Sequence, residues 1–246
     1  MSAARNAALA LLALAVASAA PAADEPRAPD GGATDGGAPD AATAGAPAVA
    51  EEKLVRIDPR AFEVVRDDSG PVNYYTVVAD PEGDYIRSAY EAKFETTTLA
   101  WPIPEKLRKD VVRVRWRWRA LTLPQGGNEC QSGKNDSAAV VYLTFKRGWN
   151  WYGLKYVWSS VGPRGATCDK RRNLLRSQDT IVVESGGPVG EWRTVEVDPQ
   201  AEFRRHFDKG RSTDPPDFMG IGIMSDGDQT HSASAADFGG FVLTLR

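Results

Sequence analysis

Cysteine and histidine, the side chains that most often bind transition metals, occur only twice each in this chain of 246 residues. Cys130 and Cys168 do not form a Cys-x-x-Cys pair, and few histidines are present to complete a metal site with them. In an oxidising compartment two cysteines most simply bond to each other. We predict a Cys130–Cys168 disulfide that joins two loops and encloses two strands; two free thiols are the alternative.

A strong excess of either charge is also lacking. The chain has 30 basic and 33 acidic residues, and residues 1–52 hold two of the basic and seven of the acidic ones, which leaves 28 and 26 for the rest. A polyanion partner would require a basic domain or stripe. We therefore expect no nucleic-acid partner.

An apolar run long enough to span a membrane is missing as well. Residues 1–23 hold Arg5, a short Ala/Leu/Val run and then "ASAAPAA", the layout of a secretory signal peptide. Residues 24–52 are rich in Ala, Gly, Pro and Asp and contain no aromatic residue, so we predict a disordered linker. We expect cleavage near residues 20–24, one domain over residues 53–246, no membrane span after cleavage, and a monomer in the periplasm or outside the cell.

Signatures of nucleophilic catalysis and of dinucleotide binding are absent from the sequence. No strand–turn–helix pattern surrounds a serine, and Gly220 and Gly222 lack the third glycine and the following helix of a dinucleotide fingerprint. A hydrolase that uses Glu184 with Asp226 or Asp228 stays open, because the separation of the carboxylates cannot be read from the sequence.

Period-two alternation is the strongest pattern that the chain does contain. In "DVVRVRWRWRAL" (residues 110–121) Val and Trp alternate with four arginines, which is typical of a strand with one face on the core. The arginine face is either a solvated surface paired with glutamates of a neighbouring strand or the wall of a cleft for an acidic or hydroxyl-rich ligand.

Several further short segments rich in β-branched and aromatic residues indicate strands, and signals for helices are scarce. The best helix candidate is "DPQAEFRRHF", with Asp198 as N-cap and Pro199 in the first turn. We predict an all-β protein: an antiparallel β-sandwich of jelly-roll, galactose-binding-like type with one short helix across its end.

Five segments together resemble a family of exported bacterial proteins catalogued as domain of unknown function 3047. They are "VRVRWRWRAL", "GKNDSAAVVYLTF", "LKYVWSS", "IVVESGGPVGEWRTVEVDPQAEFRRHF" and "GIGIMSDGDQTHSASAADFGGFVL". The resemblance covers about residues 85–246 and implies a sandwich of galactose-binding-like pattern without implying an activity. Two positions differ: Asn135-Asp136 stands where relatives have Asp-Asp, and Asp226-Gly-Asp-Gln-Thr230 where they have Asp-Thr-Asp-Asn-Thr.

The acidic loop after "GIGIM" is the first candidate site. Asp226 and Asp228 are one residue apart, so in an extended segment their side chains and that of Thr230 point the same way, and Asp136 can join them at the same rim. Such oxygens suit calcium, with Asp226 and Asp228 as ligands, or the hydroxyls of a sugar. The alternative is a turn whose carboxylates bond to their own backbone.

The segment "GWNWYG" is the second candidate site. Trp149 and Trp151 are expected in a hairpin turn between strands that end at Lys146 and begin near Gly153, where exposed rings could stack on sugars or else cap the sandwich.

Export, a sandwich fold, these tryptophans and the acidic loop favour a non-catalytic module that binds a glycan or another hydroxyl-rich ligand of the cell envelope. An envelope polysaccharide hydrolase or lyase with a carboxylate pair, and a tethered protein–protein adaptor, are the alternatives. Of cofactors, only calcium is indicated.

Overall fold

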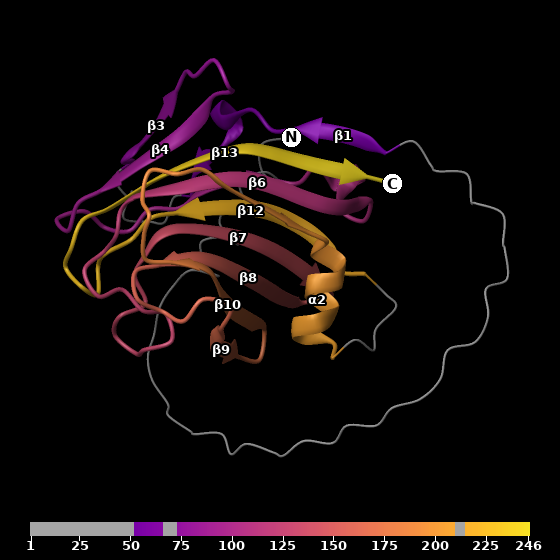
Figure 1. Cartoon of the computed structure of the whole chain (residues 1–246). Helices are drawn as coiled ribbons and strands as arrows, with labels where there is room; N and C mark the ends of the chain where they lie inside the picture. The colour runs from indigo at the N-terminus through magenta and orange to yellow at the C-terminus, as the bar shows by residue number, and fades with distance from the viewer. Residues whose placement is uncertain (1–51, 66–72, 210–214) are drawn as a thin grey trace, which may run out of the picture.

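A computed structural model describes residues 52–65, 73–209 and 215–246 (Figure 1). The predicted signal peptide and linker therefore lie outside the described residues, apart from Glu52. Within the described residues no helix is both long and apolar enough to cross a membrane.

Two β-sheets face each other in the described part of the chain, as the sequence predicts. The six-stranded sheet has the order β11-β6-β13-β4-β3, with β1 also paired to β13. Its strands are β1 (Lys53–Arg56), β3 (Tyr75–Val78), β4 (Tyr85–Tyr90), β6 (Val111–Thr122), β11 (Arg193–Val197) and β13 (Ser234–Leu245).

The seven-stranded sheet has the order β2-β5-β12-β7-β8-β10-β9. Its strands are β2 (Glu63–Val64), β5 (Leu99–Pro102), β7 (Ser137–Arg147), β8 (Asn150–Ser159), β9 (Thr167–Arg172), β10 (Arg176–Ser185) and β12 (Asp217–Met224). Two 3-10 turns, η1 (Pro59–Ala61) and η2 (Glu105–Leu107), precede β2 and β6.

The core lies between the sheets and is rich in tryptophan. On β6 the alternation predicted from the sequence is observed: Trp116 and Trp118 are fully buried, while the neighbouring Arg115, Arg117 and Arg119 are not. Trp116 packs edge-on against Tyr156 and Trp118 against Trp158, both from β8 in the other sheet, with ring centroids 5.5 and 6.3 Å apart. These contacts join the two layers.

One strand pair departs from the antiparallel pattern: β10 runs parallel to β8. The chain leaves β8, forms β9 at the sheet edge, and returns as β10 between β9 and β8. β9, with the sequence TCDKRR, has four charged residues, whereas β10 carries the buried Ile181 and Val182. Because charged strands suit sheet edges, the later strand takes the inner position.

The single predicted helix is α2 (Pro199–Phe207) in the described residues. The Asp198 carboxylate caps it by accepting from the backbone N–H groups of Gln200 and Ala201, both at 2.9 Å. Phe203 is fully buried against Phe145 of β7, so the helix closes one end of the sandwich.

The arginine face of β6 pairs with glutamates and with one aspartate. Arg113 lies 3.3 Å from Glu52 and 4.0 Å from Glu196 of the neighbouring strand β11, as one alternative predicts. Arg117 lies 3.9 Å from Glu82.

Arg119 and Arg87 both bind the carboxylate of Asp237, which is fully buried on β13, at 2.7 and 2.8 Å. Arg117 and Arg119 also lie over the ring of Trp192, at 4.4 and 4.6 Å from its centroid. Because the buried Asp237 carboxylate is paired with two guanidinium groups, its role is to link strands β4, β6 and β13 of the six-stranded sheet.

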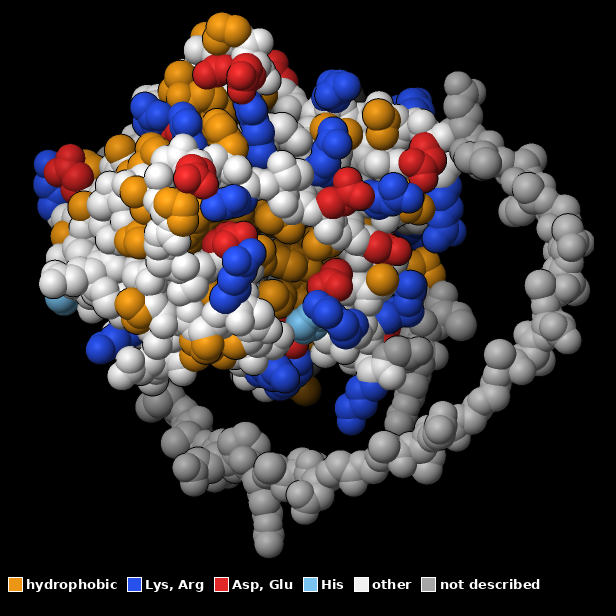
Figure 2. Space-filling model, in the orientation of Figure 1, with side chains coloured by type: hydrophobic (Ala, Val, Ile, Leu, Met, Phe, Trp, Pro, Cys, Tyr) orange, Lys and Arg blue, Asp and Glu red, His pale blue; other side chains and the backbone are white. Residues whose placement is uncertain are grey.

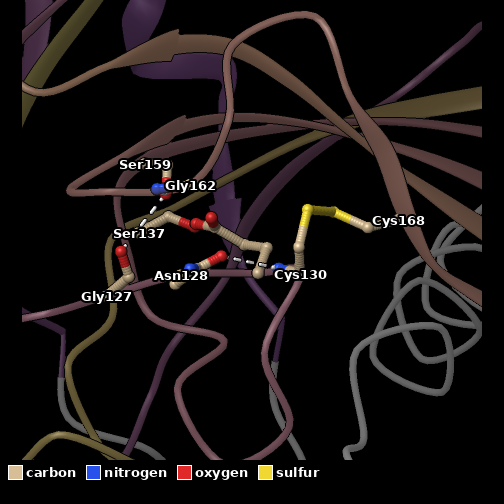
Figure 3. The surroundings of a disulfide bond; sticks show 8 residues. Gly127, Asn128, Cys130, Ser137, Ser159, Gly162 and Cys168 are labelled. Carbon is tan, nitrogen blue, oxygen red and sulfur yellow. Dashed lines mark hydrogen bonds between the residues drawn. A yellow bond between two sulfur atoms is a disulfide. The ribbon is translucent and has the colours of Figure 1, made fainter.

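The predicted disulfide between Cys130 and Cys168 is present (Figure 3). Cys130 is in the loop before β7 as expected, but Cys168 lies in β9 rather than in a loop. Hydrogen bonds hold the surrounding backbone: the Asn128 side chain accepts from the Cys130 N–H, and Ser159 accepts from Gly162 N–H. A disulfide in a folded domain is consistent with an extracytoplasmic location.

We expect loss of this disulfide to lower the free energy of unfolding by about 4 kcal/mol, because the bond closes a loop with a sequence separation of 38 residues. Urea unfolding of the Cys130→Ser/Cys168→Ser variant, compared with the parent, measures the difference. The parent with a reductant is the control and should match the variant. An unfolding midpoint that does not move in either case would contradict the expectation.

Candidate functional site

The structure brings three predicted carboxylates together at one end of the seven-stranded sheet. Asp136 directly precedes β7, and Asp226 and Asp228 follow β12. Since β7 and β12 are antiparallel neighbours, with Met224 opposite Val140, the start of one strand lies beside the end of the other. One oxygen from each carboxylate lies within 4.8 Å of the other two. We call Asp136, Asp226 and Asp228 the acidic cluster.

Two members of the acidic cluster hold the loop after β12 against β7. The Asp226 carboxylate accepts from Ser137 N–H at 2.9 Å, and the Asp226 N–H donates to the Ser137 carbonyl at 3.2 Å. The Asp136 carboxylate accepts from the backbone N–H groups of Gln229 and Thr230 at 3.3 and 2.6 Å. Asp136 and Asp226 thus bond to backbone N–H groups, which is the structural role that the turn alternative predicts for these carboxylates.

The loop itself is tightly closed. A Cβ atom at Gly227 would stand 2.1 Å from the Ser232 carbonyl oxygen, so only glycine fits there. The sequence predicts that the Thr230 side chain joins the acidic cluster, but its hydroxyl lies 2.7 Å from the Ser232 hydroxyl instead. Thr230 contacts Asp136 through its backbone N–H.

Burial and crowding disturb the ionisation of the acidic cluster. Burial raises the pKa of Asp226 to about 7; the ammonium of Lys155 opposes this rise, and Asp136 adds to it. The pKa of Asp228 is also raised, first by burial and then by its contact with Asp136. Raised pKa values on two neighbouring carboxylates mean that a proton or a cation beside them is favoured over two uncompensated charges.

Lys155 supplies the nearby positive charge, a role that the sequence analysis does not predict. Burial lowers the pKa of Lys155, but Tyr142, Asp226 and Glu129 outweigh that effect and the pKa is raised overall. Among the β6 arginines, Arg119 binds Asp237 of its own six-stranded sheet. The signal in the sequence was a single lysine within the apolar strand β8, which indicates a buried cation that needs a negative partner.

The two tryptophans lie at the other end of the sheet. β7 is 11 residues long and runs from Asp136 towards Trp149, a length of about 35 Å in extended geometry. Figure 1 shows β12 ending at one side of the sheet and β7 at the other. Trp149 is 87% exposed in the turn, but Trp151 is half-buried within β8, because that strand begins at Asn150 rather than near Gly153.

The Glu184 carboxylate, considered for a catalytic pair, receives a hydrogen bond from Arg164 at 3.0 Å. Over the face seen in Figure 2, positive and negative side chains alternate instead of separating by sign, in agreement with the near-neutral composition of the domain.

The chain belongs to the family described as "Protein of unknown function (DUF3047)", whose model matches residues 68–242. This confirms the resemblance seen in the sequence. No curated protein matches the sequence.

Among solved structures, the fold is similar to the family 11 carbohydrate-binding module of a cellulosomal cellulase from Clostridium thermocellum, with 9% identity, a TM-score of 0.37, and coverage of 81% of this chain and 90% of that one. It is similar to endoglucanase 3 of family GH12 from Trichoderma harzianum, with 10% identity, a TM-score of 0.39, and coverage of 80% and 98%.

A third similar structure is the xyloglucanase domain of NopAA, a type three effector from Sinorhizobium fredii, in complex with cellobiose. It has 11% identity, a TM-score of 0.43, and coverage of 80% of this chain and 99% of that one. These likenesses concern the sandwich architecture alone.

Protonation of Asp226 should make stability depend on pH. Its folded pKa of about 7 lies above the unfolded value of about 4, so its contribution to stability is complete below pH ~4 and is lost as pH rises through ~7. We expect the free energy of unfolding to fall over this window by on the order of 3 kcal/mol, and Asp226→Asn to remove most of the fall. Urea unfolding at several pH values measures it.

The matched control for this measurement is Asp110→Asn, an exposed carboxylate at the other end of the sheets. It should keep the pH dependence of the parent. An Asp226→Asn profile that is parallel to the parent profile would show that another group titrates.

Calcium tests the cation role of the acidic cluster. If a cation replaces the shared proton, calcium should raise the melting temperature of the parent, because a ligand that binds only the folded state stabilises it. Asp228→Asn should abolish the rise, whereas Asp217→Asn, at the opposite end of β12, should retain it. A parent melting temperature that is insensitive to calcium would leave only the proton and Lys155 as partners.

Proposed function

We propose that the protein is a non-catalytic module that binds a glycan or another hydroxyl-rich ligand of the cell envelope. We place the ligand on the outer face of the seven-stranded sheet, the face that points away from the core. The supporting observation is a group of polar side chains in the middle of this face whose hydrogen-bonding groups the fold does not fully use.

Strand register defines the outer face. Tyr142 of β7 is opposite Lys155 of β8, which is opposite Thr180 of β10. One step towards the β7–β8 hairpin, Gly153 is opposite Gln178. These residues alternate with Leu143, Leu154 and Ile181 of the main core, so their side chains point to the other side of the sheet.

The polar groups of this face lack strong partners among the described residues. Gln178 Oε1 and Thr180 Oγ1 have none. The Tyr142 hydroxyl contacts the sulfur of Met224 at 3.9 Å, and Lys155 Nζ reaches the Asn135 carbonyl at 3.5 Å, the limit for a hydrogen bond. The four side chains are only 0–8% exposed, so these unused groups lie beneath the surface of the outer face and a ligand has to open that surface to reach them.

The chemistry of the outer face matches a sugar. A hydroxyl both donates and accepts, so it can satisfy an amide oxygen, a threonine hydroxyl and an ammonium together. Gly153, Gly220 and Gly222 carry no side chain on this face, and the Gln178 side chain packs over Gly153. Trp151 lies on the same face at the hairpin end, with Lys146 Nζ 5.4 Å from its ring centroid, and offers a ring for stacking.

A second candidate function, an envelope polysaccharide hydrolase or lyase, has one observation in its favour. The pKa of Asp226, raised to about 7 by burial, suits a general acid near neutral pH. Asp136 and Asp226 already accept backbone hydrogen bonds, however, which favours the binding role.

A glycan panel followed by calorimetry on the hits tests the proposal. We expect Gln178→Ala and Thr180→Val each to weaken binding about tenfold, because each removes one hydrogen bond to the ligand. Thr194→Val, on an exposed position of β11 in the other sheet, is the matched control and should bind like the parent.

Turnover assays on the same hits separate the two candidate functions. Binding without turnover supports the module. Turnover that disappears in Asp228→Asn would replace it with the enzyme. Failure of the whole panel to bind, or equal binding by the parent and both outer-face variants, would contradict the proposed site.

A further inference from the structure

Two neighbouring hairpin turns carry large apolar side chains at their most exposed positions. Trp149 is 87% exposed in the β7–β8 turn, and Leu174 and Leu175 are 93% and 53% exposed in the β9–β10 turn. We call these three residues the tip patch. Exposed apolar residues that are scattered singly need no explanation, but residues that gather at one place mark an interaction surface.

Turn geometry does not account for these residues. Arg147 is opposite Asn150, so Gly148 and Trp149 form the turn, and Gly148, with φ 58°, supplies the left-handed conformation. In the other hairpin Asn173 and Arg176 exchange backbone hydrogen bonds at 2.7 and 3.3 Å around the two leucines. Such turns favour Gly, Asn, Asp or Pro, so a Leu-Leu pair there points to a role outside the fold.

The two turns lie side by side. β8 and β10 are parallel neighbours, with Trp151 opposite Arg176. The Trp151 N–H donates to the Leu175 carbonyl at 2.9 Å, which ties the first residues of one hairpin strand to the tip of the other hairpin. The tip patch is therefore one surface at one end of the sheet, opposite the acidic cluster.

Basic residues surround the tip patch. Residues 146–151 and 169–176 contain six Lys or Arg and one acidic residue, Asp169, although the domain as a whole is nearly neutral. Three of the arginines bind carboxylates: Arg147 binds Asp208, Arg171 binds Asp169 and Arg172 binds Asp179. Lys170 is exposed, and Lys146 lies over Trp151.

We propose that the tip patch docks the protein on the surface of an anionic lipid bilayer. Trp149 lies in the interfacial region, the two leucines enter the acyl boundary, and Lys146 and Lys170 face lipid phosphates. Tryptophan favours the membrane interface, and lysines and arginines beside it are attracted to anionic headgroups. A sugar would use the tryptophan ring but not two leucines on a separate convex turn.

This inference is independent of the proposed function. It rests on Trp149, Leu174 and Leu175 at the hairpin tips, whereas the glycan proposal rests on Gln178 and Thr180 in the middle of the outer face. Lys146, which lies over Trp151, is the residue that both proposals involve. Docking by the tips leaves the acidic cluster at the far end of the sheet, turned away from the bilayer. Failure of one proposal therefore leaves the other unaffected.

Fluorescence quenching tests the docking locally in the full chain. Vesicles of equimolar phosphatidylcholine and phosphatidylglycerol with brominated acyl chains should quench Trp149, and Trp149→Phe should lose this quenching. Leu174→Ser/Leu175→Ser should reduce the vesicle affinity of the quenched state by about tenfold or more, because two leucines no longer enter the apolar region. Pure phosphatidylcholine vesicles should quench less.

Val161→Ser is the matched control, since Val161 is 62% exposed in the loop after β8, away from both tips. It should be quenched like the parent, and melting curves should show that every variant folds. Equal quenching in the parent and in Trp149→Phe, or vesicle affinity unaffected by the leucine substitutions, would overturn the proposal. So would a glycan that alters Trp149 fluorescence while the vesicles do not.

Discussion

Strand β7 is the constraint on which the arrangement of this protein depends. It lies between β12 and β8 in the middle of the seven-stranded sheet, and its residues from Ser137 to Phe145 are all buried. Its inward side chains meet the main core, and Tyr142 points to the outer face. Burial on both sides fixes its register with both neighbours. Its two ends therefore position the acidic cluster and the tip patch.

At its beginning, β7 places Asp136 beside the residues that leave β12. The resulting closeness of three carboxylates is unfavourable by itself, and the fold offsets it with backbone N–H groups and with Lys155 from β8. At its other end, the same strand turns at Gly148 and exposes Trp149. One strand thus separates a crowded, charged end from an apolar, basic one.

The six-stranded sheet also contains a buried carboxylate, Asp237, but its charge is compensated in a different way. Asp237 is buried among polar neighbours as Asp226 is, but it receives the guanidinium groups of Arg87 and Arg119. Two bound cations leave that carboxylate fully compensated, and it has a structural role. Asp226 has one ammonium nearby and two other carboxylates, so its ionisation stays sensitive to its surroundings. For this reason the acidic cluster is a better candidate for binding a proton or a cation than the carboxylate beside the arginine face of β6.

The sequence by itself determined the two-layer β architecture, the strand β6, the helix after Asp198 and the pairing of Cys130 with Cys168. Each of these follows from local periodicity, from capping chemistry or from the presence of only two cysteines. Only the tertiary structure decided which side chains meet across strands. The parallel position of β10, the approach of Lys155 to Asp226 and the pairing of Trp151 with the Leu175 turn depend on strand order and register. Those follow from burial summed over both sheets, which no single segment of the chain contains.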